Sequence, residues 1–365
     1  MMDQELRYAN TAVFYTNGEA LEIVKLPIPA LKSGELLIRN ACTTLCRSDI
    51  STYIGKRKEK TPTILGHEIV GRIESFGPNT PCQDQRGQEL KEGDLVTWAI
   101  FASNPQTELA ERGIPQKAEG LFKYGHEQLT ETNTLHGGLS EYTILHIHTP
   151  LAKLKEDVPV KIAAIINCAV ATVAGAYRLL GDVQNRNILI SGVGMLGIIA
   201  CAMAKAAGAK TIVAVDVEDE RLKTAKRFGA DICLRGDTSY ATELNALMGK
   251  SNPIDGLIEL SGVGAVMEYT LNLLGIGGTA VWVGAVFPQP ALQLDAEKII
   301  RNLHVIKGLH NYNTEDFVAA VVFMEQYYAQ FPFTELVYDG FDLAHVNEAF
   351  EYALKQNPYR VGIRF

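Results

Sequence analysis

Hydrophobic and polar positions follow two different patterns along the chain. Up to about residue 150, short runs rich in β-branched residues are separated by turns of Gly, Pro and Asn, as in ELLIRNACTT, EIVGRIESFG and DLVTWAIF. Such runs between turn residues predict a mainly β half. From about residue 165 to 300, strand-like runs alternate with segments of helical spacing, as in NILISG, TIVAVD and TAVWVGAV. This alternation is typical of a parallel, doubly wound sheet, so the pattern predicts an α/β fold.

The composition is that of a globular protein with roughly two domains, since 47% of the 365 residues are hydrophobic and 21% are charged. The net charge of −8 offers no basic footprint for nucleic acid. The most apolar segments are short for a membrane span and rich in Gly and Ala, so we expect no membrane association. Six scattered cysteines, without a recognisable secretory signal, indicate reduced thiols or metal ligands in a cytoplasmic protein.

A glycine-rich turn in the second half gives the first chemical signal. It follows the strand-like NILIS and opens a long helical segment, with the spacing G-x-G-x-x-G. Glycines at these positions allow a tight turn and let the backbone approach a pyrophosphate at the helix N-terminus. The residues of the turn predicted to bind the cofactor are Gly192, Gly194, Met195, Leu196 and Gly197.

Asp216 ends the next strand-like run, nineteen residues after Gly197. A carboxylate there can accept hydrogen bonds from the adenosine ribose and would repel a 2′-phosphate, which favours NAD over NADP. Arg221 follows closely and keeps NADP open as the less favoured cofactor. A glycine-rich turn with a surface Asp is the alternative interpretation.

Three residues far apart in the sequence have side chains suited to one metal ion. Cys46 stands in TTLCRSDI, His67 in the apolar run TPTILGHEIVGRI, and Cys168 in IINCAVAT. Two thiolates and an imidazole suit Zn²⁺ and leave its fourth position open, as catalysis requires. Spacing alone does not identify such dispersed ligands, so a structural Cys168 and a core His67 are the alternatives. Glu68 also needs a partner, because an unpaired buried charge is costly.

This ordered set of features resembles the zinc-dependent medium-chain dehydrogenases, which include the alcohol and polyol dehydrogenases. The resemblance extends over essentially the whole chain, through ELLIRNACTTLCRSDI, GHEIVG, KEGDLV, GGLSEYTIL, GVGMLG and the terminal YRVGIRF. It implies a GroES-like, mainly β catalytic domain at residues 1–160, completed by 305–365, and a Rossmann coenzyme domain with a doubly wound parallel sheet at 161–304. It also implies hydride transfer between an alcohol and NAD, and a homodimer or homotetramer.

The same resemblance implies roles for single residues. Cys46, His67 and Cys168 are the expected ligands of a catalytic zinc, with Glu68 beside the metal as an occasional ligand or a group that tunes it. Ser48 is expected to hydrogen-bond the substrate hydroxyl and pass on its proton. Many relatives end this relay with a His where Ser51 stands, so the proton must leave by water or another group. The expected cofactor contacts beyond the turn are Arg47, Thr172, Asp216, Arg221 and Arg360, with Arg47 and Arg360 at the pyrophosphate and Thr172 beside the nicotinamide.

Many relatives also hold a structural zinc in a lobe with the pattern C-x₂-C-x₂-C-x₇-C. In the stretch NPQTELAERGIPQKA, this register falls on Asn104, Thr107, Ala110 and Ala118. None of these side chains is a thiolate, so we expect one catalytic zinc and no structural zinc. Packing, backbone hydrogen bonds and a short helix in TELAERG are expected to hold the lobe instead.

The stretch GIPQKAEGLFKYGHEQL resembles, more closely, a subgroup of alcohol dehydrogenases associated with phosphonate metabolism. That resemblance implies a small polar or anionic alcohol, with its anionic group near Lys123, Tyr124 and His126 and near the basic loop at residues 55–60. A solvated basic loop is the alternative, since charge runs usually face water. Alternative functions are a cyclitol or sugar-alcohol dehydrogenase, a zinc-free quinone or enoyl reductase, and a non-catalytic NAD-binding protein of this fold.

Overall fold

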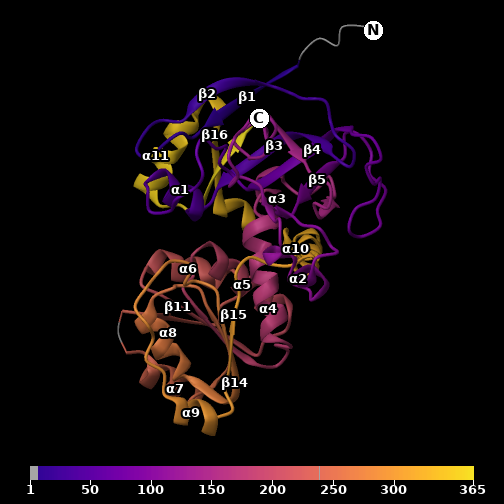
Figure 1. Ribbon diagram of the computed structural model, residues 1–365. Helices are drawn as coiled ribbons and strands as arrows, with labels where there is room; N and C mark the ends of the chain where they lie inside the picture. The colour runs from indigo at the N-terminus through magenta and orange to yellow at the C-terminus, as the bar shows by residue number, and fades with distance from the viewer. Residues whose placement is uncertain (1–6, 238) are drawn as a thin grey trace, which may run out of the picture. The chain divides into compact units, whose positions relative to one another are not determined.

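The computed structural model describes residues 7–237 and 239–365. These residues fold into two compact units, drawn in Figure 1. The first unit extends to Cys168 and takes up Asn313–Tyr328 and Phe333–Phe365, and the second comprises Ala169–Tyr312 and Ala329–Pro332. The main passages of the chain between the units follow residues 168 and 312, with a brief return at 329–332, whereas the domain limits expected from the sequence are residues 160 and 304.

The first unit is built on a sheet with the strand order β16-β17-β3-β4-β5-β9, and β8 also pairs with β3. The pairs are antiparallel except for β16 with β17. The strands of this sheet are β3 (Leu36–Leu45), β4 (Glu68–Phe76), β5 (Leu95–Trp98), β8 (Tyr142–Leu145), β9 (Leu151–Lys153), β16 (Val337–Asp342) and β17 (Arg360–Arg364). Two small antiparallel pairs accompany it, β1 (Tyr8–Val13) with β2 (Glu22–Pro27) and β6 (Phe101–Ala102) with β7 (Phe122–Lys123). The prediction of a mainly β half is confirmed.

Strand β3 is buried along almost its whole length, because apolar clusters pack against it from more than one side. One cluster contains Ile38, Ile69, Val96, Trp98 and Tyr124. Another contains Phe14, Leu45, Ile64, Phe350 and Val361. β-Branched and aromatic residues fit such a pleated, covered surface. The packing fixes the end of β3, from which the chain continues into Cys46.

Helices of the first unit are short, apart from two near the C-terminus. They are α1 (Arg47–Tyr53), α2 (Glu108–Glu111), α3 (Val160–Ala163), α10 (Thr314–Tyr327) and α11 (Val346–Gln356), with 3₁₀ turns η1 (Pro115–Lys117), η3 (Phe333–Leu336) and η4 (Leu343–His345). A π-helical turn, η2 (Ile166–Val170), contains Cys168. Helix α11 ends at Asn357 in the left-handed conformation, with φ 49°, and this turn leads the chain into β17 and Arg360.

The second unit contains a six-stranded parallel sheet with the order β12-β11-β10-β13-β14-β15. Its strands are β10 (Asn187–Ser191), β11 (Thr211–Asp216), β12 (Ile232–Arg235), β13 (Ile254–Glu259), β14 (Leu274–Trp282) and β15 (Val305–Gly308). The direction of winding reverses between β10 and β13. Parallel sheets bind ligands outside the carboxyl ends of strands at such a switch point. The parallel pairing and this reversal of strand order confirm the predicted doubly wound sheet.

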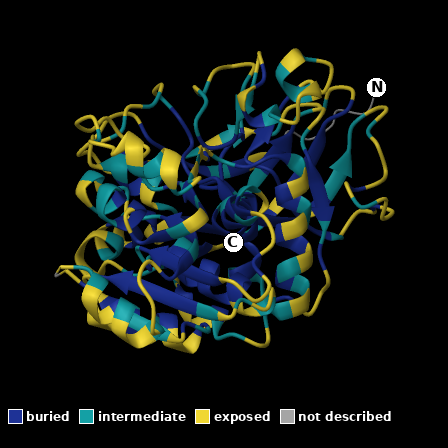
Figure 2. Ribbon diagram, turned by 90° about the horizontal axis from the view of Figure 1, so that it is seen from below, coloured by how far each residue is buried: buried dark blue, intermediate teal, exposed yellow. Residues whose placement is uncertain are grey.

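Helices connect the strands of this sheet. They are α4 (Ala171–Leu180), α5 (Met195–Ala206), α6 (Asp219–Arg227), α7 (Ala241–Met248), α8 (Gly264–Leu271) and α9 (Ala296–Arg301). Leu189, Val213, Leu257 and Leu274 belong to the core between sheet and helices. Figure 2 shows the strands largely in dark blue, for buried, while the exposed residues in yellow lie in loops and on one side of helices.

One helical segment, Val160–Leu180, has the length and hydropathy of a membrane span. However, 78% of its apolar window is buried inside the protein. A span would instead turn its apolar side chains toward lipid. The segment is therefore a core helix, and its hydropathy reflects burial.

Candidate active site

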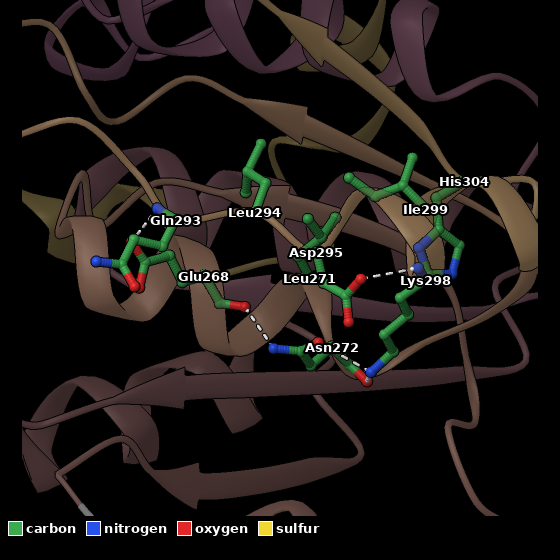
Figure 3. A pocket seen from close by; sticks show the side chains of 9 residues that line it. All are labelled: Glu268, Leu271, Asn272, Gln293, Leu294, Asp295, Lys298, Ile299 and His304. Atoms are coloured by element: carbon green, nitrogen blue, oxygen red, sulfur yellow. Dashed lines mark hydrogen bonds between the residues drawn. The ribbon is translucent and has the colours of Figure 1, made fainter.

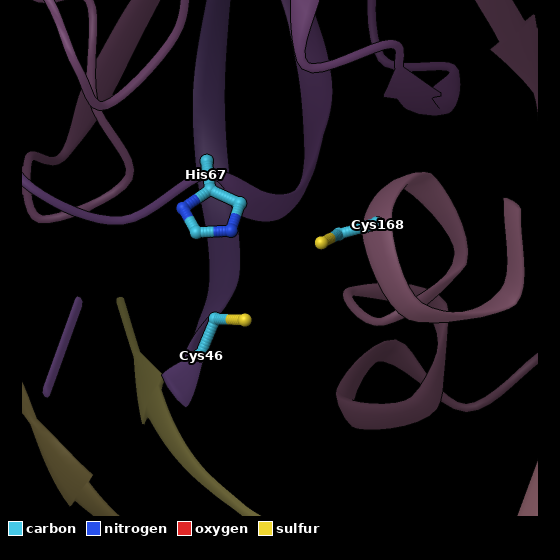
Figure 4. A group of neighbouring side chains, drawn as sticks. All are labelled: Cys46, His67 and Cys168. Carbon is cyan, nitrogen blue, oxygen red and sulfur yellow. The ribbon is translucent and has the colours of Figure 1, made fainter. Parts of the chain in front are cut away.

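Three side chains from distant parts of the first unit converge on one point. Cys46 lies between β3 and α1, His67 directly precedes β4, and Cys168 lies in the π-helical turn η2. Their candidate ligand atoms all lie within 4.8 Å of one another. Figure 4 shows both sulfur atoms and one ring nitrogen of His67 directed toward the space between them. The fold thus brings together residues that are 21 and 101 positions apart in the sequence.

The donor set fits a soft divalent cation such as Zn²⁺. A hydrogen bond from Cys168 lowers the pKa of the Cys46 thiol well below its ordinary value, against burial and with help from the charges of Arg360 and His67. The hydrogen bond to Cys46 and burial raise the pKa of Cys168. Two hydrogen-bonded thiols of this kind are both stabilised as thiolates by a divalent cation. Cys46, His67 and Cys168 are therefore the residues that would hold the metal.

Asp49 supports two of these three segments, and the sequence-based prediction missed it. Its buried carboxylate accepts hydrogen bonds from the N–H groups of Cys46, at 2.8 Å, and Gly66, at 3.1 Å. Its Oδ1 lies 3.4 Å from Nδ1 of His67, and Figure 4 shows the other ring nitrogen on the side of the sulfur atoms. Burial opposes ionisation of Asp49, but His67 outweighs it and lowers the pKa of Asp49. The available signal was an acid three residues after Cys46, where it caps a helix.

Glu68 and Arg360 form a buried ion pair beside Cys46. Arg360 donates from Nε to Oε2 of Glu68 at 2.7 Å and from Nη2 to Oε1 at 2.8 Å, and Thr44 donates a short hydrogen bond to Oε2. Nη2 of Arg360 also lies 3.5 Å from Sγ of Cys46. A bidentate pair of this kind satisfies both charges, which explains why an apolar run can contain Glu68.

This pair involves two of the residues for which the sequence predicts a role at the site. The carboxylate of Glu68 is engaged by Arg360 and does not belong to the group of three metal-ligating atoms. The guanidinium of Arg360, a residue only 3% exposed, is enclosed in the first unit with Glu68, whereas the sequence predicts that it faces a pyrophosphate. Both residues are long and charged, and their contact across 292 positions has no local sequence signal.

Three other residues predicted for the reaction site, Ser48, Arg47 and Thr172, lie at different distances from the cysteine and histidine cluster. The hydroxyl of Ser48, in the first turn of α1, lies 3.5 Å from Nε2 of His67, and Ser51 follows one turn later. Arg47 is exposed and hydrogen-bonds the side chain of Asn357. Thr172 lies in the first turn of α4, in the second unit. Ser48 is thus the member of this set that the fold places beside the metal-ligating atoms.

The glycine-rich turn joins β10 to α5, as predicted from the sequence. Gly192 has φ 87°, a conformation that favours glycine, and a Cβ there would lie 2.8 Å from the backbone N of Ser261. A Cβ on Gly197 would lie 2.1 Å from the carbonyl oxygen of Gly192. Gly194 is the N-cap of α5 and has no atom within 4 Å of such a Cβ. Two of the glycines are therefore needed by the fold itself, while Gly194 leaves open space at the helix N-terminus.

Asp216 supports this turn from the end of β11. Its carboxylate accepts hydrogen bonds from the N–H groups of Val193 at 2.8 Å and Glu218 at 3.0 Å. Nη1 of Arg221 lies 4.0 Å from its Oδ2. Asp216 therefore has a structural role that the sequence did not reveal, in addition to the predicted contact with ribose.

The basic loop at residues 55–60 has two different sides. Lys56, Lys58 and Lys60 are exposed, while Arg57 and Glu59 are half-buried. Glu59 accepts from Nε of Arg57 at 2.7 Å and lies 3.0 Å from Nδ1 of His126. The ring of His126 lies 4.9 Å from that of His67, measured between centroids. A chain of contacts thus links the inner side of the loop to His67, one of the candidate metal ligands.

Tyr124 does not fit the predicted contact with an anionic group. It is fully buried, its hydroxyl lies 2.6 Å from that of Thr149, and it accepts a hydrogen bond from the N–H of His146. These partners belong to the interior of the first unit, so Tyr124 is structural. Lys123 is only half-buried and keeps its place as a candidate.

Two small cavities lie apart from the predicted site residues. One, of about 90 Å³ in the second unit, is shown in Figure 3 and includes Glu268, Asn272, Gln293, Asp295 and Lys298 in its wall. Its polar groups bond to one another, as between the N–H of Gln293 and Glu268 at 2.7 Å. The other, of about 190 Å³ in the first unit, is lined in part by Lys32, Glu35 and His146. None of the predicted site residues lines either cavity.

The lobe expected to lack a structural metal contains the predicted short helix. Helix α2 (Glu108–Glu111) has Thr107 as its N-cap, and the 3₁₀ turn η1 follows. The N–H of Ile114 bonds to the carbonyl of Leu109, and the side chain of Asn313 reaches the carbonyl of Gly113 at 3.4 Å. Backbone hydrogen bonds of this kind order the lobe.

A doubly wound sheet with a glycine-rich turn, together with a cluster of two cysteines and a histidine in a mainly β unit, defines the class of zinc-dependent dinucleotide oxidoreductases. The family described as "Zinc-binding dehydrogenase" matches residues 195–326, and "Alcohol dehydrogenase GroES-like domain" matches residues 32–156. Together these matches cover well over half of the chain. The chain belongs to the zinc-binding alcohol dehydrogenases of the medium-chain dehydrogenase family, and it is an oxidoreductase acting on CH–OH groups.

The chain is similar to individual proteins as well. Alcohol dehydrogenase-like 2 of Arabidopsis thaliana is 28% identical over 73% of this chain and 69% of its own length. L-Threonine 3-dehydrogenase of Shewanella frigidimarina is 26% identical over 90% of this chain and 88% of its own. The crystal structure of an alcohol dehydrogenase from Thermotoga maritima superimposes with a TM-score of 0.91, at 24% identity, over 98% of this chain and 99% of that one.

Proposed function

We propose that the protein is a zinc-dependent alcohol dehydrogenase that transfers hydride between a small polar or anionic alcohol and NAD. The observation that carries the proposal is the convergence of Cys46, His67 and Cys168 within 4.8 Å. Three protein ligands leave a fourth position open, which is the difference between a catalytic and a structural zinc. A zinc-free reductase has no need of this cluster, and a cyclitol or sugar alcohol is the alternative substrate.

In this proposal the chain's own residues orient the substrate and move its proton. Zinc held by the three ligands would supply Lewis acidity that lowers the pKa of the alcohol hydroxyl. Ser48 takes the hydroxyl proton, which its position 3.5 Å from Nε2 of His67 supports. Ser51 has no basic nitrogen, so the proton leaves by water or another group. Asp49 orients the imidazole of His67, and the Glu68–Arg360 pair sets the charge next to Cys46.

We assign the coenzyme to the second unit, with the pyrophosphate at the turn from Gly192 to Gly197, the ribose at Asp216 and the nicotinamide near Thr172. The like charge of Asp216 and a 2′-phosphate makes NAD the preferred cofactor, while Arg221 reduces this preference without abolishing it. Asp216→Ala should therefore narrow the ratio of kcat/KM with NAD to that with NADP. Wild-type protein that used NADP as efficiently as NAD would contradict the assignment.

We further propose that the substrate carries an anionic group, such as the phosphonate or phosphate expected for the phosphonate-associated subgroup. Burial and the charges of Lys117 and Arg57 lower the pKa of Lys123, so these cations repel one another. Arg57 is in turn linked through Glu59 and His126 to His67. An anion placed there would relieve the repulsion. Lys123→Met should raise KM for 2-hydroxyethylphosphonate and leave KM for 1-propanol unchanged, with the exposed Lys58→Met as the matched control.

We propose residues 1–160 with 305–365 as the catalytic domain, residues 161–304 as the coenzyme domain, and a cytoplasmic homodimer or homotetramer. Exposed apolar side chains in the second unit support association, since Ile276, Ile300 and Leu303 are 80%, 71% and 69% exposed. Such side chains are common at subunit interfaces. Light scattering of the purified protein checks this, and a monomer at high concentration would contradict it.

The proposed reaction is tested by mutation of the cluster. Cys46→Ala and His67→Ala should abolish alcohol-dependent formation of NADH and lower the zinc content, while binding of NADH, followed by fluorescence, stays near the wild-type value. Cys82→Ala is the control, because Cys82 is exposed and outside the cluster. The substrate panel comprises phosphonates, sugar phosphates, cyclitols and simple alcohols. Activity of Cys46→Ala close to wild type would favour a zinc-free reductase, and an absence of any oxidation would favour a non-catalytic protein.

A further inference from the structure

Asn167 lies next to Cys168 in the π-helical turn and is completely buried. Its side-chain amide donates to the carbonyl oxygen of His67 at 3.0 Å and to that of Trp98 at 2.8 Å. One side chain therefore joins the segment that carries one metal-ligating residue to the backbone of another. Neither the sequence pattern nor the predicted ligand set points to this residue.

The two carbonyl groups lie where the strands β4 and β5 reach the end of their ladder. The last registered pair is Val70 with Thr97, and the hydroxyl of Thr97 donates to the carbonyl of Ile69 at 3.1 Å. The amide of Asn167 bonds to two carbonyls beyond this point, that of His67, directly before β4, and that of Trp98, the last residue of β5. Buried carbonyl groups need such donors, so Asn167 both completes the end of the ladder and attaches the π-helical turn to it.

We propose that Asn167 is a positioning residue of the metal centre, which fixes Cys168 relative to His67. This inference rests on the zinc centre proposed above. A π-helical turn contains one residue more than an α-helical turn, so the direction of Cys168 depends on how the turn is anchored. Metal ligation tolerates errors of only a few tenths of an ångström in ligand distance. The two hydrogen bonds of Asn167 supply an anchor at the residue adjacent to the ligand.

The test compares two variants that each remove a buried side-chain amide. One amide, that of Asn167, contacts the segment that carries His67, and the other does not. Asn167→Leu keeps a similar volume and removes both donors, and Asn167→Gln restores an amide. Asn40→Leu is the matched control, since Asn40 lies in the same unit, is 3% exposed and donates to Ser140 and Thr143 at 2.7 and 2.9 Å. Asn167→Leu should weaken zinc binding by about 10- to 100-fold, measured by competition with a chelator, and change the visible spectrum of the cobalt-substituted protein. Asn40→Leu should lose thermal stability yet keep zinc affinity and spectrum, and Asn167→Gln should recover part of both.

The outcomes separate this inference from the proposed function. Wild-type protein that bound neither zinc nor cobalt would overturn the metal centre itself. Unchanged zinc affinity and cobalt spectrum in Asn167→Leu, with a wild-type protein that binds both metals, would overturn the positioning role alone. If Asn167→Leu does not fold, Asn167→Ala is measured in the same way. Failure of both to fold, while Asn40→Leu folds, would show that Asn167 is required for the fold and would also overturn the positioning role.

Discussion

The carboxylate of Glu68 shows how a single charged residue is accommodated in an apolar run. Its partner in the fold is Arg360, which engages both carboxylate oxygens. Burial raises the pKa of Glu68, and the charge of Arg360 acts against this. The stability of the site therefore depends on keeping both members of the pair.

Arg360→Met should destabilise the protein by about 3–5 kcal/mol, because it leaves the Glu68 carboxylate buried without its partner. The double variant Glu68→Gln/Arg360→Met should recover much of the loss, since it removes the stranded charge. Arg72→Met is the control, because its pair with Glu156 is exposed and should cost less than about 1 kcal/mol. Denaturant-induced unfolding measures all three free energies. An equal loss from Arg360→Met and Arg72→Met would show that burial of the pair is unimportant.

His136 is a second residue whose environment has a measurable consequence. It is fully buried, and burial lowers its pKa from 6.5 to about 4. As the pH falls from 6.5 to 4, the unfolded chain binds a proton that the folded protein does not, so stability is lost across this window. The full loss corresponds to roughly 3 kcal/mol.

His136→Phe cannot titrate and should therefore flatten the decline in unfolding free energy between about pH 7 and pH 4.5, as measured in urea. His345→Gln is the control, since His345 is exposed and its pKa is raised by Asp342. It should leave the acid-induced loss in place. A decline in His136→Phe as steep as in the wild type would assign the loss to other groups.

Among the elements, the turn between β10 and α5 contains one glycine that the fold requires, Gly197, and one that we expect only cofactor binding to require, Gly194. Gly197→Ala should destabilise the protein by about 1–3 kcal/mol, because its Cβ would lie 2.1 Å from the backbone of Gly192.

In Gly194→Ala, by contrast, the new Cβ meets no atom within 4 Å. The substitution should therefore cost no more than about 1 kcal/mol of stability, from the loss of a preferred N-cap residue. A methyl group there would nevertheless obstruct the approach of a pyrophosphate, so NADH affinity should fall about tenfold or more. Unaltered NADH binding by Gly194→Ala, in a fluorescence titration, would place the dinucleotide elsewhere.

The lobe around α2 is an element whose sequence allowed a detailed prediction. The short helix was expected in TELAERG, and it forms at Glu108–Glu111 after Thr107. An N-cap residue followed by helix-forming residues is a local signal, so no distant contact was needed to anticipate it. The register C-x₂-C-x₂-C-x₇-C, expected from the resemblance to the family, falls on Asn104, Thr107, Ala110 and Ala118, none of which is a cysteine.

For the whole molecule, we expect the lack of cysteines at these four positions to leave a single zinc site, at Cys46, His67 and Cys168. Elemental analysis of the purified, tag-free protein should find about one zinc per chain, held by the three-ligand cluster, and Cys46→Ala should reduce that value toward zero. Removal of zinc by a chelator should also lower the Tm, because a metal that binds the folded state stabilises it. Two zinc ions per chain, found reproducibly, would mean that the lobe binds a metal through other donors.

Local patterns in the sequence were sufficient for the architecture. Strand-like runs between turns, the alternation of strand and helix, and the spacing of Gly192, Gly194 and Gly197 depend on neighbours a few residues apart, so they can be read along the chain. The three candidate metal ligands were predicted from their chemistry and from resemblance to a family, since their spacing is not diagnostic, and the fold brings their ligand atoms within 4.8 Å of one another.

Only the tertiary structure decided the partners of the charged and polar side chains at the site. The pairing of Glu68 with Arg360, the support of His67 by Asp49 and the two hydrogen bonds of Asn167 depend on where separate segments meet, across up to 292 positions of the chain. The same holds for Asp216, which binds the backbone of its own glycine turn, and for Tyr124, which is turned into the core. A side chain's type fixes which contacts it can make, but which of them forms depends on burial and on atoms brought close by the fold, and these are not local properties of a sequence.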